Sequence, residues 1–182
     1  MIKGWHIVLL LGLTGLLWLF YLGLWGDPHA IPTVLIGTAA PRFSGPELGT
    51  GKTVSLDEFQ GKVVVLNFWA SWCQECQLEH QNLQAIYKEF SQNPDFMMLG
   101  VDYQDKESDA QEYLRTFGNN FRHIRDPNGV ISIDYGVYGV PETFVFDRKG
   151  IIRHKQVGPI VGSTYTYLVN EVIRPLLQGQ QS

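Results

Sequence analysis

The sequence predicts an α/β domain with a mixed β-sheet, which follows an apolar N-terminal segment. After Phe43, short β-branched and apolar runs typical of buried strands alternate with longer stretches that have helical periodicity. Near the C-terminal end, two strand-like runs follow each other with only a tight turn between them. The resulting order β-α-β-α-β-β-α favours a central mixed sheet flanked by helices.

The N-terminal segment reads WHIVLLLGLTGLLWLFYLGLW over residues 5–25, and only His6 could carry a charge. A helix needs about 20 apolar residues to cross a bilayer, and aromatic residues such as Trp5 and Trp25 suit the membrane interface. The alternative is a cleaved signal peptide, but its apolar core would be about 7–15 residues and a small-residue cleavage site would follow. We therefore expect residues 1–26 to be a transmembrane anchor.

The charged residues on either side of this run indicate its orientation in the membrane, and the residues after it predict a tether. Lys3 precedes the run and Asp27 follows it, which favours a cytoplasmic N-terminus with the domain on the other side of the membrane. Residues 27–42, DPHAIPTVLIGTAAPR, contain three prolines and little periodicity. They are expected to form a tether to a domain at residues 43–182.

The first half of that domain shows a strand, a turn, a second strand and a helix. We expect a short strand at Thr53–Leu56 and a turn or helical turn at residues 57–60. The run KVVVLNF at Lys62–Phe68 is typical of a buried central strand. A helix is predicted from Cys73 to about Gln92, because its apolar residues lie on one face and Asn93-Pro94 would end it.

The second half supplies the other elements. We expect a strand at Phe96–Val101 and a helix at about Ser108–Phe117. Two strands at Pro141–Phe146 and Ile151–Val157 are separated by Asp-Arg-Lys-Gly, which predicts a hairpin. The last helix is predicted at about Ser163–Leu177.

Composition and charge exclude one class of partner. The chain is 45% hydrophobic and 18% charged, which is ordinary for a globular protein, and its net charge is −4. Lys3 is the only charged side chain in residues 1–26, so the rest of the chain carries 13 basic and 18 acidic residues. Nucleic-acid binding needs a basic patch, and no basic run is present. We expect no nucleic-acid partner.

The chain has two cysteines, Cys73 and Cys76, both in WASWCQECQLEH at residues 69–80. Cys73 is predicted at the N-terminus of a helix, where the macrodipole and free N–H groups lower a thiol pKa. Cys76 lies one turn further along, within reach of a disulfide bond. In an oxidising compartment, a chain with only these cysteines fits a domain whose one disulfide is catalytic. The pattern favours redox chemistry over two buried structural cysteines.

Other cysteine chemistries lack the residues that they need. A c-type haem site would have histidine directly after the second cysteine, where this chain has Gln77. His80 could face a metal, as in copper chaperones, but no further soft ligand is evident, and we expect it to be a partly exposed helix residue. A peroxiredoxin would have threonine in place of Ala70. His123 and His154 are expected at the surface, and no metal site is predicted.

The cysteine motif and a second motif together resemble a known family. FWASWCQEC follows a hydrophobic strand, and GVPETFVFD comes about 65 residues later, as in the thioredoxin superfamily. The stretch GVYGVPETFVFDRKG at Gly136–Gly150 is similar to the signature of the cytochrome c maturation thiol–disulfide oxidoreductases, the CcmG/DsbE family. The resemblance covers roughly residues 31–177 and the anchor. It implies a thioredoxin-like fold.

The resemblance also implies roles for particular residues. Pro141 matches the cis proline that lies opposite the cysteines in thioredoxin-like folds. Glu79 matches a buried glutamate that moves protons for the inner thiol, with a solvated helix glutamate as the alternative. Glu142 is expected to help form an acidic groove. Substrate is expected to contact Trp72, Val140, Pro141 and Glu142.

The dipeptide between the cysteines departs from the family pattern. Many relatives have a proline there, whereas this chain has Gln74-Glu75. A negative charge on Glu75 would disfavour the thiolate. The redox potential of the family therefore does not carry over to this chain.

The same resemblance implies that the chain is a membrane-anchored protein-disulfide reductase whose catalytic domain faces the periplasm. Its expected substrates are apocytochrome c or a partner dithiol protein of cytochrome c maturation, and its electrons come from a membrane thiol reductase. No cofactor is expected beyond the Cys73–Cys76 disulfide. Two alternatives remain open: a less specific tethered reductase of the same fold, and a non-catalytic metallochaperone.

Overall fold

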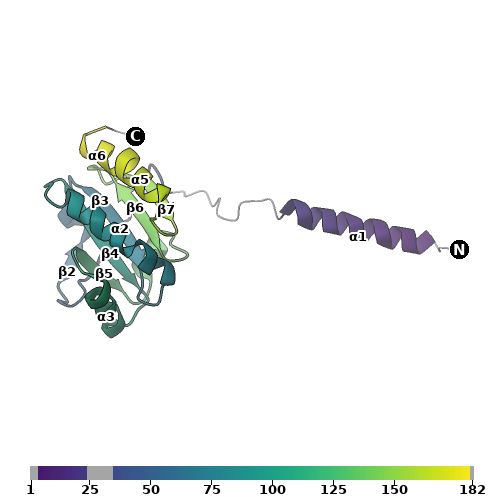
Figure 1. Ribbon diagram of the computed structural model, residues 1–182, viewed down its shortest axis with the longest axis horizontal. Coiled ribbons are helices and arrows are strands. Elements are labelled where there is room, and N and C mark those ends of the chain that lie inside the picture. Colours follow the sequence, from purple (N-terminus) through teal and green to yellow (C-terminus); the bar gives the residue numbers. More distant parts are fainter. Residues whose placement is uncertain (1–3, 24–34, 181–182) are drawn as a thin grey trace. The chain divides into compact units, whose positions relative to one another are not determined.

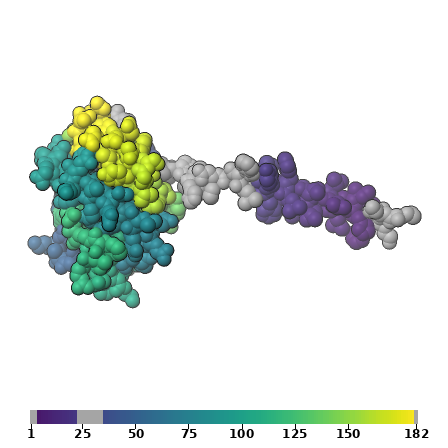
Figure 2. All heavy atoms as spheres, viewed as in Figure 1, coloured from purple at the N-terminus to yellow at the C-terminus, as the bar shows by residue number. Residues whose placement is uncertain are grey.

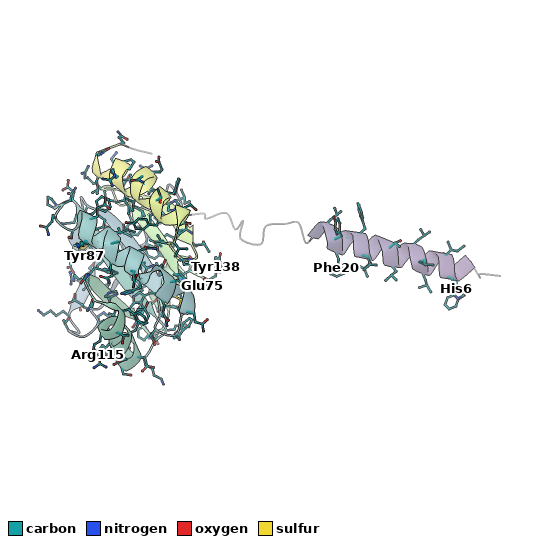
Figure 3. The ribbon with its side chains drawn as sticks, viewed as in Figure 1. His6, Phe20, Glu75, Tyr87, Arg115 and Tyr138 are labelled. Carbon is teal, nitrogen blue, oxygen red and sulfur yellow. A yellow bond between two sulfur atoms is a disulfide. The ribbon has the colours of Figure 1, made fainter. Side chains whose placement is uncertain are left out.

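The computed structural model describes residues 4–23 and 35–180, in two compact units divided after Thr33. The first unit contains helix α1, Gly4–Gly23 (Figure 1). Its stretch Gly4–Leu22 is long and apolar enough to cross a membrane, and none of that stretch is buried. Side chains such as His6 and Phe20 point outward from the helix (Figure 3). Residues 1–3 and 24–34, which belong to the predicted anchor and tether, lie outside the described residues.

The second unit is built on a mixed five-stranded sheet, as the sequence predicts. Its strand order is β5-β4-β3-β6-β7. The central strand β3 pairs in parallel with β4 and antiparallel with β6, and β5 and β7 form the two edges. The strands are β3 (Val63–Trp69), β4 (Phe96–Tyr103), β5 (Arg122–Asp126), β6 (Glu142–Phe146) and β7 (Ile152–Val157).

Helices cover the sheet and extend over its ends. A 3₁₀ turn follows the short strand β2 (Thr53–Ser55), and the long helix α2 follows β3. The last helix that the sequence predicts is a C-terminal helical segment made of α5, a π-helical stretch and α6. These elements are η1 (Leu56–Phe59), α2 (Gln74–Phe90), α3 (Glu107–Phe117), α4 (Val130–Asp134), α5 (Ser163–Tyr167), η2 (Leu168–Ile173) and α6 (Arg174–Leu177). Figure 2 shows α2 and the C-terminal segment together on one surface of the domain.

The buried strand β3 explains why the sheet carries apolar groups on both faces. Successive side chains of a strand point to opposite faces, and all seven residues of β3 are buried. Val63 and Val65 pack into one cluster with α2 and the C-terminal helical segment. Leu66 and Phe68 belong to a second cluster with Tyr135. The apolar run that predicted a central strand thus fills both layers of the core.

Three elements and part of the tether differ from the sequence expectation. Strand β1 (Ser44–Pro46), which pairs antiparallel with β2 (Thr53–Ser55), strand β5 and helix α4 were not predicted. The predicted tether at residues 27–42 is wrong in its second half. The N–H of Gly37 donates to Ile152 O and the N–H of Ala40 donates to Gly150 O, each at 2.8 Å. These bonds attach the segment to β7 and to the turn before it, so the segment is part of the domain.

Candidate active site

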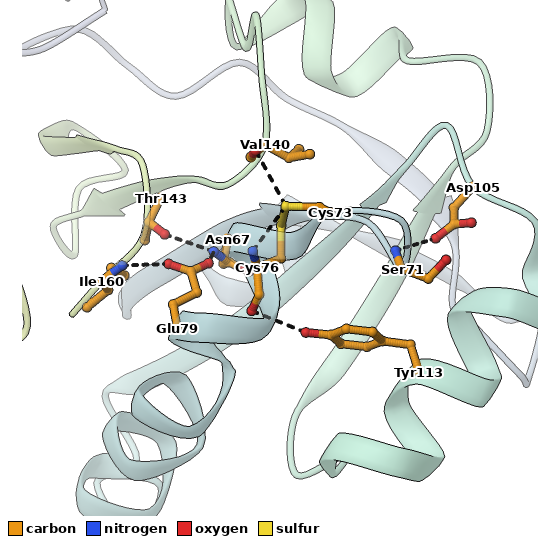
Figure 4. Close-up of a disulfide and its surroundings, with 10 residues drawn as sticks. All are labelled: Asn67, Ser71, Cys73, Cys76, Glu79, Asp105, Tyr113, Val140, Thr143 and Ile160. Carbon is orange, nitrogen blue, oxygen red and sulfur yellow. Dashed lines mark hydrogen bonds between the residues drawn. A yellow bond between two sulfur atoms is a disulfide. The ribbon is translucent and has the colours of Figure 1, made fainter.

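The two cysteines lie where β3 ends and α2 begins. Cys73 is the N-cap residue of α2, and Cys76 is in its first turn. Their sulfurs form a disulfide of 2.07 Å (Figure 4). The N–H of Cys76 points at Cys73 Sγ at 3.1 Å. A cap sulfur that accepts a helix N–H is placed where the helix stabilises negative charge.

Both sulfur residues are largely covered by protein. Cys73 is 5% exposed and Cys76 is 2% exposed, so the first is the more open of the two by a small margin. Trp72, directly before them, is 57% exposed. Behind the pair, the hydroxyl of Tyr113 on α3 donates to Cys76 O at 3.2 Å. The residues on either side of Cys73, Trp72 and Gln74, are exposed, whereas Cys73 itself is buried.

The loop before β6 covers the first sulfur. Its Val140–Pro141 peptide is cis, which confirms the prediction from the PETF motif. The carbonyl oxygen of Val140 lies 3.5 Å from Cys73 Sγ (Figure 4). In the reduced protein a Cys73 thiol could donate to this oxygen. The predicted substrate contacts Trp72 and Val140 thus flank Cys73 on two sides.

Glu79 is fully buried on α2, one turn beyond Cys76, as the family resemblance implies. Its Oε1 accepts a hydrogen bond from Asn67 Nδ2 and its Oε2 accepts one from the N–H of Ile160, both at 2.8 Å. Burial raises the pKa of Glu79 to about 7, although both hydrogen bonds oppose the change. A carboxyl group of that pKa can take or give a proton near neutrality.

Glu142 does not form an acidic groove, so that expectation is wrong. Its side chain is 1% exposed and lies 2.8 Å from Lys155 Nζ, which is itself 6% exposed. Burial raises the pKa of Glu142 and the lysine opposes that change. The N–H of Tyr138 donates to Glu142 Oε1 at 3.4 Å. Glu142 therefore fixes the loop that carries Val140 rather than presenting charge to a substrate.

The histidines are also more buried than the sequence suggested. His80 is 4% exposed and its Nε2 lies 3.0 Å from Gly118 O, so it is a core residue. His123 is 4% exposed, against the prediction of a surface residue, and burial lowers its pKa to about 3. His154 on β7 is half-buried. Among residues 4–23 and 35–180, no group of three or more potential ligand side chains could hold a metal ion.

Sequence reasoning missed several residues of the site. Asn67 holds Glu79, Tyr113 caps the carbonyl of Cys76, and Asp105 accepts the N–H of Ser71 at 2.6 Å. One signal was present: Asn67 is the only polar residue in the run VVVLNF at residues 63–68, and a polar side chain in a buried strand requires a partner. The other two contacts depend on how separate elements pack, which the local sequence does not show.

The geometry defines a class of protein before any comparison. A cysteine pair at the start of a helix, a cis-proline loop over the first sulfur and a buried carboxyl of raised pKa one turn beyond the second are the parts of a thioredoxin-like thiol–disulfide oxidoreductase.

Sequence similarity to known proteins identifies the family within this class. Residues 36–155 match the AhpC/TSA family. The thiol:disulfide interchange protein DsbE of Allochromatium vinosum is 39% identical over 90% of this chain and 86% of its own length. The corresponding protein HelX of Rhodobacter capsulatus is 36% identical over 84% of this chain and 83% of its own. The chain thus belongs to the DsbE (CcmG) family of thiol:disulfide interchange proteins, within the AhpC/TSA family.

A solved structure agrees with this assignment. The crystal structure of a Chlorobium tepidum protein described as DsbE has a TM-score of 0.71 and 30% sequence identity, over 78% of this chain and 97% of that one. The activity of the chain is thiol–disulfide exchange through the CxxC pair.

Proposed function

We propose that the protein is a membrane-anchored reductase that opens disulfides of apocytochrome c, or of a partner dithiol protein, before haem attachment. The observation that carries this is similarity to DsbE and HelX over most of the chain, together with the PETF loop seated on Cys73. The helix at Gly4–Leu22 would tether the domain to the cytoplasmic membrane, with the domain in the periplasm. No cofactor beyond the cysteine pair is needed.

The reaction transfers two electrons in two exchange steps. The Cys73 thiolate attacks one sulfur of the substrate disulfide, forms a mixed disulfide and releases the other substrate sulfur as a thiolate. Cys76 then loses its proton and attacks Cys73 Sγ, which releases the second substrate thiol and leaves the Cys73–Cys76 disulfide. The substrate is reduced and the protein is oxidised. A membrane thiol reductase would return the two electrons.

The site favours the first step by stabilising the Cys73 thiolate and the second by accepting the proton of Cys76. The N–H of Cys76 and the helix terminus stabilise the Cys73 thiolate. Glu79, with its pKa raised to about 7 by burial, can accept the proton of the Cys76 thiol at the resolving step. Glu75 adds a negative charge between the cysteines, which makes Cys73 a weaker acid than the dipole alone would.

The test compares two substrates of the reduced full-length protein in detergent. One is a peptide with an oxidised CxxCH haem-attachment sequence, and the other is insulin. We expect the CxxCH peptide to be reduced at least about tenfold faster, because contacts with Trp72 and the loop that carries Val140 would select a peptide by its sequence as well as by its disulfide. Equal rates would instead indicate the less specific reductase. A Cys73→Ser variant is the inactive control.

A further inference from the structure

A buried lysine on β7 lies against the loop that covers Cys73. The side chain of this residue, Lys155, is 6% exposed. In the register of β6 and β7, Lys155 is opposite Phe144. Glu142 lies two residues before Phe144 on β6, so it is a diagonal neighbour of Lys155 on the same face of the sheet. The strand pairing thus brings a cation and an acid together inside the domain.

These two side chains form a buried ion pair. Lys155 Nζ lies 2.8 Å from Glu142 Oε2, and the glutamate side chain is 1% exposed. The contact has the geometry of an ion pair rather than of an aligned hydrogen bond. Lysine and glutamate are rarely buried unless they are paired, because removal from water disfavours the ionised form of each. Each of the two residues therefore depends on the other to remain charged inside the domain.

The ammonium group of Lys155 also contacts the loop before β6. Its Nζ donates to Gly136 O at 3.3 Å and lies 5.4 Å from the centre of the Tyr138 ring. The N–H of Tyr138 donates in turn to Glu142 Oε1 at 3.4 Å. Lys155 therefore holds this loop at two residues before its cis peptide bond and, through Glu142, at the residue directly after that bond.

The part of the loop between these points carries the contact with the attacking cysteine. Val140 O lies 3.5 Å from Cys73 Sγ (Figure 4). Groups beside a reacting atom need a closely defined position, and the residues that support them from behind supply it. Lys155 supplies that support from the neighbouring strand, because it holds the chain on both sides of Val140.

We propose that Lys155 is a positioning residue for thiol–disulfide exchange, which keeps the Val140 carbonyl group beside Cys73 through its contacts with the loop and with Glu142. Because Val140 lies next to Cys73, a peptide disulfide that reacts with this cysteine is expected to contact the loop. A small disulfide reagent has little surface that could do so. Loss of the ammonium group should therefore slow the attack on a peptide more than the attack on a small reagent. This role concerns the exchange step itself and is independent of whether the substrate is a cytochrome.

The first test measures the attack by Cys73 in the Cys76→Ser background of the full-length protein in detergent, on an oxidised CxxCH peptide and on a small chromogenic disulfide. We expect Lys155→Met to attack the peptide about tenfold more slowly, because misplacement of a group beside the reacting atoms costs rate, and to attack the small disulfide at nearly the parent rate. Lys149→Met is the matched control, since Lys149 is an exposed lysine in the turn at the other end of the same hairpin. Equal losses with both disulfides, or no loss with either, would overturn the proposal.

The second test follows the Tyr138 amide by NMR as a function of pH in the oxidised full-length protein in detergent micelles, since this N–H donates to Glu142 Oε1. Lys155 opposes the effect of burial on the pKa of Glu142, whereas Phe68, opposite Glu142 on β3, is uncharged. Lys155→Met should therefore raise that pKa, and the inflection of the amide shift should move to higher pH. The double variant Glu142→Gln/Lys155→Met should lose the inflection. An inflection that stays in place or moves to lower pH in Lys155→Met would contradict the ion pair.

The double variant also covers the case in which Lys155→Met fails to fold because an unpaired acid is left buried. With both charges removed and both shapes nearly kept, the double variant should fold. Its attack on the peptide should remain slower than its attack on the small disulfide, relative to the parent, because the contacts of the ammonium group with Gly136 and Tyr138 are lost. A double variant that attacks both disulfides at the parent rate would show that Lys155 has no positioning role.

Discussion

The side-chain amide of Asn67 donates a 2.8 Å hydrogen bond to Oε1 of Glu79, and both residues are buried. The same amide nitrogen lies 2.9 Å from Thr143 Oγ1, so one side chain joins β3, α2 and β6 beneath the disulfide. An amide holds a carboxyl group in place without adding positive charge. An arginine there would keep Glu79 ionised, whereas Asn67 leaves it able to exchange a proton near neutral pH.

Glu79→Gln should slow the resolving step and remove its pH dependence. In the parent protein the carboxyl group is protonated below a pKa of about 7 and can accept the Cys76 proton only above it. Resolution should therefore accelerate as pH rises through 7, and the variant should be about a hundredfold slower at pH 8. Stopped-flow measurement of mixed-disulfide decay checks this. Glu89→Gln on the same helix is the control, and a variant profile identical to the parent's would exclude the proton-transfer role.

Asn67→Ala should raise the pKa of Glu79 further. The Asn67 hydrogen bond lowers that pKa against the effect of burial, so removing the donor favours the neutral acid. The inflection in the resolution profile should move upward from about 7. Thr143→Val removes the other partner of Asn67 and leaves its bond to Glu79, so it should move the inflection little. An inflection that moves downward in Asn67→Ala would show that the amide does not stabilise the charged form.

His123→Phe should reduce the loss of stability in acid. Burial holds the pKa of His123 at about 3, below its ordinary value of 6.5. Between pH 6.5 and 3, His123 is therefore protonated in the unfolded chain and neutral in the folded chain. The free energy of unfolding falls as the pH falls through that window. Urea unfolding at pH 7 and pH 5 should show a drop in the parent that is smaller in the variant by about 2 kcal/mol. Equal drops in both proteins would mean that another group is responsible.

Much of the fold follows from local patterns, and the exceptions have a physical reason. The run around Val63–Trp69 and the helix after it could be predicted because their apolar residues repeat regularly. Strand β5 reads RHIRD and looks like solvent-exposed sequence, yet Arg122 pairs with Glu47 at 2.6 Å and His123 packs on Trp69. Its charges are balanced by residues distant in the sequence, which no local pattern reveals.

The site was predictable where a motif carries the chemistry. The CxxC spacing, the PETF loop and Glu79 could be assigned from the sequence and its family resemblance. The contact between Asp105 and Ser71 could not, because it depends on how the segment after β4 packs against the loop before Cys73. Glu142 was misassigned for a related reason, since Lys155 on β7 neutralises it inside the domain.

Residues 1–26 should hold the protein in the membrane. The exposed apolar helix at Gly4–Leu22 has no partner surface of its own within the described part of that unit, so a bilayer is the environment that would cover it. Alkaline carbonate should leave the full-length protein in the membrane pellet, and a variant that starts at residue 27 behind a cleavable leader should be released. Release of the full-length protein would rule out the anchor.

The two cysteines should differ in the adducts that they trap. Cys73 caps α2 and receives the N–H of Cys76, so its thiolate is stabilised, whereas Cys76 is inside the helix and almost fully covered. Only a thiolate attacks a disulfide, so Cys73 reacts first and Cys76 acts only after the mixed disulfide forms. Cys76→Ser should therefore accumulate covalent adducts with its natural partner that disappear on reduction.

Cys73→Ser should accumulate few such adducts under the same conditions. Its remaining thiol is buried against Tyr113 and lacks the helix cap, so it cannot reach a partner disulfide. Non-reducing gels of both variants, expressed at equal level, make the comparison, and the double variant gives the background. Adducts that form mainly with Cys73→Ser would reverse the roles, because the covered sulfur would then be the one that attacks.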